Sequence, residues 1–428
     1  MSKDMLVHFI GAEAAVASLT DRRLDEISLP RRDNANLLGN IYLGEVENVL
    51  PGMQAAFVNI GLEKNSFLYV EDAVAVDGRL RGGERQSEGE RDRSISDLVK
   101  KGQHIIVQIF KEPSGTKGAR VTMQPSLPGR YLVLLPCGNY VAVSRRIENE
   151  EERERLKELI RAELPSNMGA IIRTVAEHAD QQVLSGELRS LLKTWRRIQG
   201  WSVKSSAPSL LHSDMDLLER TVRDTNPADV DRIVTPDEDA FEKVTEVVGA
   251  IAPALKDKVV LEESQDLFLD YDVYAQLERA LQRKVWLKSG DYIIIDQMEA
   301  LTAIDVNTGK YVGERSLNDT VFKTNMEAVS EIARQLRLRN IGGIIIIDFI
   351  DMDSAEDKNR LLAALEEEMK KDRVRITVMG ITQLGLVELT RKKIGHDLSS
   401  VLECECRACG GKGRISQIAQ VFHLEKKA

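Results

Sequence analysis

The sequence predicts a multidomain protein of mixed α+β and α/β class, and three observations lead to this prediction. The chain has 428 residues, which is enough for two or three domains with cores of their own. Between residues 40 and 69, apolar and polar residues alternate in short runs, as antiparallel strands require. After residue 285, short apolar runs alternate with long amphipathic stretches, which is the pattern of an α/β layer.

The first strand-rich region predicts a small barrel. Its runs are broken by Pro51-Gly52 and by Gly61, which favour tight turns. The strand pattern resumes at 105–109, passes through a turn at 111–118 and ends with a last strand at 119–122. Residues 78–97 contain almost nothing apolar, so we expect a loop inside the barrel there and a domain boundary near 124–128.

Helices and strands of the remaining chain are predicted from periodicity and capping residues. Asn149 is expected to cap a helix to residue 164, and Ser354 a helix to about residue 371. Further helices are expected at 180–199 and 318–339, and strands at 170–174, 292–295, 301–304 and 344–347. The four isoleucines of the last strand predict burial on both faces.

Composition limits the location and the partners of the protein. The N-terminus lacks a basic stretch followed by an apolar segment, and no apolar run approaches the ~18 residues of a membrane span. We therefore expect a cytoplasmic protein without a membrane span. The formal net charge is -9, so binding to a polyanion would need local basic patches and a divalent cation.

Two predicted strands end in aspartates. Asp305 follows the apolar run at 301–304, with Asn307 two residues on, and Asp348 follows the four isoleucines. Carboxylates that converge at one sheet edge form a hard oxygen site suited to Mg²⁺ and to phosphodiester hydrolysis. Each acid could instead cap a strand or pair with an arginine, since Arg334, Arg337 and Arg339 are near in sequence. Asp296 and Asp351 are weaker candidates for the same site.

At these residues the sequence resembles a known family. LTAIDVNTG at 301–309 and EIARQLRLRNIGGIIIIDFID at 331–351 are similar to the signature blocks of the ribonuclease E/G family, and closest to its G type. The resemblance implies that Asp305 and Asp348 are Mg²⁺ ligands and that Asn307 orients the scissile phosphate or the attacking water. It also implies an endoribonuclease that leaves a 5′-phosphate and a 3′-hydroxyl.

The resemblance covers nearly the whole chain to residue 415 and implies a domain order. An RNase H-like subdomain is expected to be split by an inserted S1-like OB barrel and a 5′-sensor, and to be followed by a DNase I-like catalytic subdomain and a zinc-link. The implied boundaries are 1–35 and 219–284 for the RNase H-like parts, 36–125 for the barrel, 126–218 for the sensor, 285–400 for the catalytic subdomain, 401–415 for the zinc-link and 416–428 for a tail.

Candidate RNA contacts lie in the barrel. Phe57 and Phe67 are expected on adjacent strands, where exposed rings can stack on unpaired bases, and Lys111 and Lys117 can add phosphate contacts. A phenylalanine in a strand is more often part of a core. The motif PGMQAAFV at 51–58, however, resembles the S1-like domain of the family, which makes single-stranded RNA the expected substrate.

A second group of residues is implied to recognise the RNA 5′ end. GRYLV at 129–133 and IIRT at 171–174 resemble the pocket in which the family binds a 5′-monophosphate, with Gly129, Val133, Arg173 and Thr174 as its residues. The guanidinium of Arg173 and the hydroxyl of Thr174 suit a terminal phosphate. Taken without the resemblance, Arg173 is an ordinary arginine at the end of a strand.

Three of the four cysteines cluster near the C-terminus. CRACGGKG at 406–413 is a Cys-x-x-Cys knuckle, and structural Zn²⁺ takes four ligands, of which Cys406 and Cys409 supply two. Cys404 and His396 could complete the site, but a second knuckle from another protomer is simpler, and the resemblance implies such a zinc-linked homodimer. Because family members usually continue into a small C-terminal domain, the stability of that dimer stays open.

We expect an Mg²⁺-dependent, single-strand-specific endoribonuclease acting in rRNA processing and mRNA decay. Two alternatives remain from the sequence. A non-catalytic RNA-binding scaffold would keep the barrel and use the acids for stability only, and a different metal phosphoesterase would act on DNA or on small phosphate esters.

Overall fold

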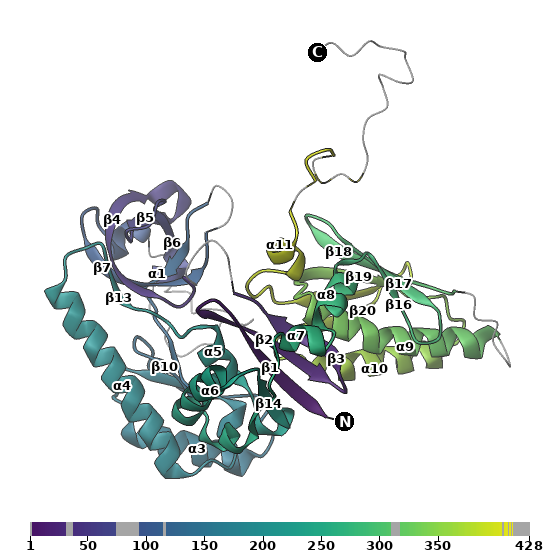
Figure 1. The fold of residues 1–428 in the computed structure, drawn as a ribbon. Helices are drawn as coiled ribbons and strands as arrows, with labels where there is room; N and C mark the ends of the chain where they lie inside the picture. Colours follow the sequence, from purple (N-terminus) through teal and green to yellow (C-terminus); the bar gives the residue numbers. More distant parts are fainter. Residues whose placement is uncertain are drawn as a thin grey trace, which may run out of the picture. The chain divides into compact units, whose positions relative to one another are not determined.

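The computed structural model describes residues 2–30, 37–73, 94–113, 117–309, 317–404, 406–409, 411 and 413 (Figure 1). The chain forms two compact units, of which the first contains Met1–Pro30, Val230–Phe241 and Lys258–Ala428, and the second Arg31–Asp229 and Glu242–Asp257. The division crosses helix α6 (Glu238–Ile251). In the part of the chain that the structure describes, no helix has the length and apolar character needed to cross a membrane.

One sheet of the first unit joins the chain start to strands more than 200 residues later. Its order is β15-β14-β1-β2-β3, with bounds β1 (Lys3–Ile10), β2 (Glu13–Thr20), β3 (Arg23–Ser28), β14 (Arg232–Thr235) and β15 (Val259–Leu261). Helices α7 (Leu267–Asp270) and α8 (Val273–Leu281) add Phe268 and Leu277 to its core, and Tyr271 joins them from the turn between the two helices. The sheet thus draws on both segments expected for a split subdomain, whose RNase H-like identity stays a prediction.

The second sheet of this unit is mixed. Its order is β16-β17-β18-β19-β21-β20, with bounds β16 (Lys284–Trp286), β17 (Tyr292–Gln297), β18 (Leu301–Asn307), β19 (Gly343–Asp348), β20 (Ile376–Ile381) and β21 (Val387–Arg391). β18 and β19 run parallel and their other neighbours are antiparallel. Helix α9 (Leu317–Leu338) connects the parallel pair, and α10 (Ala355–Lys370) packs beside it (Figure 1).

The helices cover one face of this sheet and leave the other more exposed. Ile345 and Ile347 are fully buried in the core that α9 and α10 share with the sheet, whereas Ile344 is 51% exposed. The prediction that this strand is buried on both faces was therefore wrong. Only the two parallel strands of this sheet need a crossover connection, and that connection is a single helix on one face. The other strands are antiparallel, so nothing requires a second layer on the opposite face.

Helix α9 also connects this sheet to the N-terminal one. Glu331 of α9 accepts hydrogen bonds from Arg23 of β3, Arg334 and Gln335. Arg334 in turn donates to the backbone carbonyl of Leu24, at 2.6 Å. Burial alone would raise the pKa of the Glu331 carboxyl, but the arginine contacts lower it, so the group stays charged within the fold.

The second unit contains the predicted barrel. β4 (Ile41–Leu50), β5 (Ala55–Asn59), β6 (Ser66–Tyr69), β8 (Arg120–Thr122) and β7 (His104–Lys111) follow one another, and β7 pairs back to β4, which closes a five-stranded OB-like barrel. β13 (Ser209–His212) extends it, and the short helices α1 (Val70–Ala73) and α2 (Ile95–Leu98) border the chain between β6 and β7. Most of the loop predicted at 78–97 lies outside the described residues.

The rest of this unit packs helices on a small sheet. The strands are β9 (Leu127–Pro128), β10 (Leu132–Leu135), β11 (Val141–Val143) and β12 (Gly169–Ile172), and the helices are α3 (Glu150–Glu163), α4 (Gln181–Lys204) and α5 (Leu217–Asp224). Asn149 caps α3 as predicted, since its side chain accepts from the amides of Glu151 and Glu152. α4 runs past Gly200, which does not adopt the left-handed backbone that ends helices.

Candidate functional site

Asp305 and Asp348 are direct neighbours in the sheet. The parallel ladder between β18 and β19 pairs Leu301 with Ile344 and ends by pairing Asp305 with Asp348. Cα atoms of neighbouring strands lie about 4.8 Å apart, so the two carboxylates emerge side by side. Both are exposed, while Ile304 and Ile347 beside them point into the core. The strand pairing therefore brings the two predicted acids together on the open face.

Asn307 lies on the same face, two residues after Asp305. Its side-chain amide donates to Oδ2 of Asp305 at 2.7 Å, which fixes the orientation of that carboxylate. In a planar amide the oxygen and the NH₂ group point in different directions, so the oxygen of Asn307 is directed away from the Asp305 carboxylate. The predicted trio thus forms one polar cluster at the C-terminal ends of β18 and β19.

Two buried polar side chains hold the backbone that follows each acid. Asp291 is 1% exposed and accepts from the amide of Gly309 at 2.7 Å and from the hydroxyl of Thr324 at 2.6 Å. Asn325 is fully buried, donates to the carbonyl of Ile350 and accepts from its amide, at 2.8 and 3.1 Å. Because Thr324 and Asn325 are adjacent on α9, one helix positions both loops. The sequence analysis did not identify these supporting residues.

The charges at this site repel one another. The pKa of the Asp348 carboxyl is raised, first by partial burial and then by the negative charges of Asp305 and Asp351. Asp296, the other weaker candidate, is paired with Arg283, which lowers the pKa of its carboxyl and gives it a structural role. A divalent cation between Asp305 and Asp348 would offset this repulsion, and Mg²⁺ typically uses one or two carboxylates and keeps several waters. The donor set fits that ion.

In the barrel, strand pairing aligns the predicted RNA-binding side chains. Lys111 pairs with Arg120, Arg120 with Phe67, and Phe67 with Phe57, so these residues form one row across four strands. The rings of Phe57 and Phe67 meet edge to face at 4.7 Å. Both are half-buried, which leaves part of each ring accessible. Lys117 is exposed and lies just before β8.

Tyr69 and Arg120 also belong to this surface, and the sequence analysis did not identify them. Tyr69 lies 5.2 Å from Phe67, and the guanidinium of Arg120 stacks over the Tyr69 ring at 4.4 Å. Arg120 is held by an ion pair with the buried Asp72 at 2.7 Å. The aromatic row, defined as Phe57, Phe67 and Tyr69, therefore has a fixed cation beside it. A pattern of alternate aromatics at 67 and 69 was the available signal.

The residues expected to sense the 5′ end also lie together. Arg173, at the end of β12, donates to Asp224 at 2.6 Å and to the carbonyl of Gly129 at 2.8 Å. The hydroxyl of Thr174 lies 2.8 Å from that of Ser144. Asp224 is ionised more readily than usual: burial raises its pKa, but Arg223 and Arg173 outweigh this and lower it. The guanidinium of Arg173 is thus held in place by an ionised partner.

A half-buried carboxylate, that of Glu187, shapes the loop that carries Gly129. Glu187 of α4 accepts from the amides of Arg130, Tyr131 and Leu132 at 2.7 to 2.8 Å. A Cβ at Gly129 would lie 2.7 Å from the carboxyl carbon of Glu187, so only glycine fits without a shift. Val133, on β10, is half-buried and pairs with Pro128 and Ile171.

The Cys-x-x-Cys knuckle places the thiols of Cys406 and Cys409 next to each other. Sγ of Cys409 accepts from the amide of Gly413 at 3.3 Å, and the pKa of the Cys406 thiol is lowered by the amides of Ala408 and Cys409. The lowered pKa favours the thiolate of Cys406, which is the form of cysteine that binds zinc. Over the described residues, no group of three or more Cys, His, Asp or Glu side chains is gathered as a metal site. Cys404 and His396 are accordingly not gathered with the two knuckle cysteines in this arrangement.

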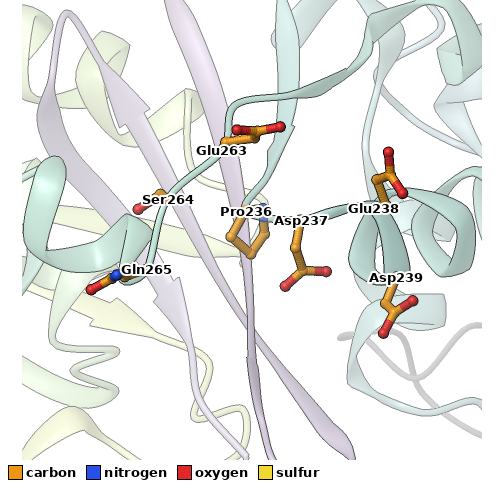
Figure 2. A pocket seen from close by; sticks show the side chains of 7 residues that line it. All are labelled: Pro236, Asp237, Glu238, Asp239, Glu263, Ser264 and Gln265. Atoms are coloured by element: carbon orange, nitrogen blue, oxygen red, sulfur yellow. The ribbon is translucent and has the colours of Figure 1, made fainter.

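A separate hollow of ≈ 580 Å³ lies elsewhere in the first unit. It is formed by residues 236–239 and 263–265, and Figure 2 shows the side chains of Asp237, Glu238, Asp239 and Glu263 around it. A hollow with four acids would repel a polyanion, and none of the candidate residues described above lines it. We therefore assign the chemistry to the exposed face of the sheet rather than to this hollow.

Comparison with known proteins agrees with this geometry. A sequence model described as the Ribonuclease E/G family matches residues 126–394, which includes both acids. The chain belongs to the Ribonuclease E/G family. It is 43% identical to ribonuclease G of Escherichia coli strain K12 over 424 residues, which covers 99% of this chain and 86% of that relative.

Other relatives extend the comparison across the family. Ribonuclease G of Haemophilus influenzae is 43% identical over 98% of this chain and 85% of its own length. Ribonuclease E of a Synechocystis strain is 42% identical over 89% of this chain but only 56% of its own length. The family resemblance expected from the two signature blocks is thereby confirmed over nearly the whole chain.

Proposed function

We propose that this protein is an Mg²⁺-dependent endoribonuclease that hydrolyses phosphodiester bonds in single-stranded RNA. Its membership of the Ribonuclease E/G family supports ribonuclease activity. The observation that carries the proposal is the pairing of Asp305 with Asp348 at the end of the parallel ladder, on an exposed face. Two carboxylates at that spacing repel each other unless a cation lies between them. In the described part of the chain, neither Asp305 nor Asp348 forms an ion pair with Arg334, Arg337 or Arg339, and Arg334 pairs with Glu331 instead.

The three side chains have separable roles. Asp305 and Asp348 would hold the cation, and the hydrogen bond from Asn307 keeps the Asp305 carboxylate in one orientation. The remaining side of the Asn307 amide can orient the scissile phosphate or the attacking water. When bound, Mg²⁺ supplies Lewis-acid chemistry and offsets the charge that develops on the phosphate. Products would carry a 5′-phosphate and a 3′-hydroxyl.

The barrel gives the proposed preference for unpaired RNA. Bases can stack on the accessible parts of Phe57 and Phe67 only when they are not paired, and stacking tolerates most sequences. Lys111, at the end of β7, and Lys117, just before β8, would contact phosphates beside the aromatic row. Substrates of this kind include single-stranded regions of rRNA precursors and mRNA, so we place the activity in rRNA processing and mRNA decay.

We further propose that the cluster of Gly129, Val133, Arg173 and Thr174 binds a 5′-monophosphate. Arg173 is already oriented by Asp224, so little side-chain entropy is lost when a phosphate binds its remaining donors. For the knuckle, Cys406 and Cys409 supply two thiolates, and a zinc ion shared with the same pair of a second chain would have four ligands. This predicts a homodimer linked by zinc.

Cleavage of a labelled single-stranded RNA with a 5′-monophosphate tests the main proposal. With Mg²⁺ present, Asp305→Asn should lower kcat by about a hundredfold or more, because the substitution removes an anionic ligand. Asp296→Asn is the matched control, since Asp296 lies on the adjacent strand, pairs with Ala303 and contacts Arg283 instead of the site. Equal rates for Asp305→Asn and wild type would refute the assignment.

The same experiment separates the two alternatives. Tight RNA binding without any cleavage in Mg²⁺ or Mn²⁺ would identify an RNA-binding scaffold. Equal turnover of RNA and DNA oligonucleotides of matched sequence would identify a phosphoesterase with a broader substrate range.

A further inference from the structure

A cluster of two aromatic rings and a lysine lies on the exposed face of the sheet that carries Asp305 and Asp348. Trp286, at the end of β16, is 61% exposed, and its ring meets that of Tyr292 at 5.5 Å with an interplanar angle of 63°. The ammonium group of Lys284 lies 3.8 Å from the Trp286 ring centroid and 3.6 Å from that of Tyr292. We refer to Lys284, Trp286 and Tyr292 as the aromatic platform.

Strand register connects the aromatic platform to the candidate active site. Trp286 pairs with Tyr292, and Tyr292 pairs with Asn307, so these three side chains lie in one row on one face. The next row contains Lys284, Ile294, Asp305 and Asp348. Paired residues of adjacent strands project to the same side of a sheet. The platform therefore shares its face with the two acids.

The distance from the platform to the acids suits a neighbouring nucleotide. Lys284 and Asp305 are separated by two strand spacings, which is about 10 Å. An RNA chain with one phosphate near Asp305 and Asp348 would span this distance of about 10 Å within a few nucleotides. Across this face, Asp348 and Asp305 come first, Asn307 lies beside them, and Tyr292, Trp286 and Lys284 follow. This order matches a nucleotide whose phosphate lies at the acids and whose base lies at the rings.

The chemistry of the platform favours an anionic partner with a flat ring. An exposed tryptophan offers a large stacking surface, and base stacking on aromatic rings is sequence-tolerant. Lys284 keeps the cluster positive, whereas Asp305 and Asp348 make the neighbouring part of the face negative. A base stacked on Trp286 would have its phosphate within reach of Lys284. A purely apolar partner would instead have to cover the ammonium group.

We propose that Trp286, Tyr292 and Lys284 form a nucleotide subsite, in which Trp286 stacks on an RNA base close to the scissile phosphate and Lys284 contacts its phosphate. This inference rests on the proposed nuclease function and adds to it a second stacking surface besides the barrel. It makes cleavage depend on an unpaired base near the cut, as well as on the bases bound by the barrel.

A cycle of protein and substrate changes tests the subsite. Substrates with one abasic nucleotide, moved stepwise through the positions flanking the cleavage site, are cleaved by wild type and by Trp286→Ala. At one position, loss of the base should lower kcat/KM of wild type by about tenfold, the size of one stacking interaction. Trp286→Ala should show a similar loss on the intact RNA and no further loss at that position.

Trp201→Ala is the matched control. Trp201 lies on α4, is 50% exposed and has a cation, Arg197, 5.7 Å from its ring centroid. This variant should keep the full abasic effect. If the effects of Trp286→Ala and base removal simply multiply at every position, the subsite is refuted. A change in oligomeric state with Trp286→Ala, without any such coupling, would mean that the platform contacts a second copy of the chain.

Tryptophan fluorescence gives a readout that does not require cleavage. The chain has three tryptophans, and Trp195 is only 5% exposed. In an Asp348→Asn background, Trp201→Phe leaves Trp286 as the exposed emitter, and a 5′-hydroxyl oligoribonucleotide should quench it. Trp286→Phe in the same background should lose most of this quenching. If quenching is unchanged in Trp286→Phe, the subsite proposal is refuted, even if the protein is an active nuclease. If the wild type is inactive but its quenching depends on Trp286, only the nuclease proposal is refuted.

Discussion

Gly309 offers a test of how tightly the end of β18 has to be held. A Cβ at this position would lie 2.1 Å from the carbonyl oxygen of Gly290, a backbone atom that cannot rotate away. Real contacts of this kind are not shorter than 3.0 Å, so the backbone at Gly309 or Gly290 has to move by about 1 Å. The same movement would stretch the 2.7 Å hydrogen bond from Gly309 to Asp291 and displace Asn307, two residues earlier.

A displacement of about 1 Å in a catalytic group can cost about a hundredfold in rate. We therefore expect Gly309→Ala to lower kcat for RNA cleavage by about that factor, measured in single-turnover assays with saturating Mg²⁺. Gly249→Ala is the control, because a Cβ there meets nothing within 4 Å and alanine favours the helix. A rate for Gly309→Ala within about twofold of wild type would refute the reasoning, provided that thermal unfolding shows a folded protein.

Three further predictions follow from the charged groups. Arg173→Ala should lower kcat/KM by about tenfold on 5′-monophosphorylated RNA but hardly on 5′-hydroxyl RNA, and equal losses on both would remove the sensing hypothesis. Because the pKa of Asp348 is raised in the folded protein, its ionisation destabilises the fold as pH rises through that pKa; metal-free Asp348→Asn should therefore resist urea better than wild type near pH 7 but not near pH 3. Elemental analysis should give one zinc per two chains, lost with Cys409→Ser, and one zinc per chain would contradict sharing.

Local signals predicted much of the secondary structure. The caps at Asn149 and Ser354 both accept hydrogen bonds from the first turn of the helices that follow them. The alternation between residues 40 and 69 gave the barrel strands, because period-two patterns mark a sheet with one buried face. The four isoleucines at 344–347 led to the wrong prediction that both faces of the strand are buried, because an apolar run does not reveal which face a neighbouring layer covers.

The two acids were predictable as a pair, but their supporting structure was not. Asp305 and Asp348 end successive strands joined by one helix, and such strands usually lie parallel and adjacent. Asp291 and Asn325 act through contacts with residues 18 and 25 positions away, which no local pattern encodes. The antiparallel neighbours that bring Trp286 and Tyr292 to the same face also depend on tertiary pairing. Domain limits and site roles stay predictions.

Helix α9 has a consequence for variants far from the acids. At Thr324 and Asn325 it holds the backbone beyond both carboxylates, and at Glu331 and Arg334 it is fastened to strand β3 of the N-terminal sheet. Because α9 is one continuous helix held at these two places, a small rotation of it would move the loops after Asp305 and Asp348 together. Substitutions at Arg23 can therefore shift the loops that follow Asp305 and Asp348 without changing any side chain of the candidate site.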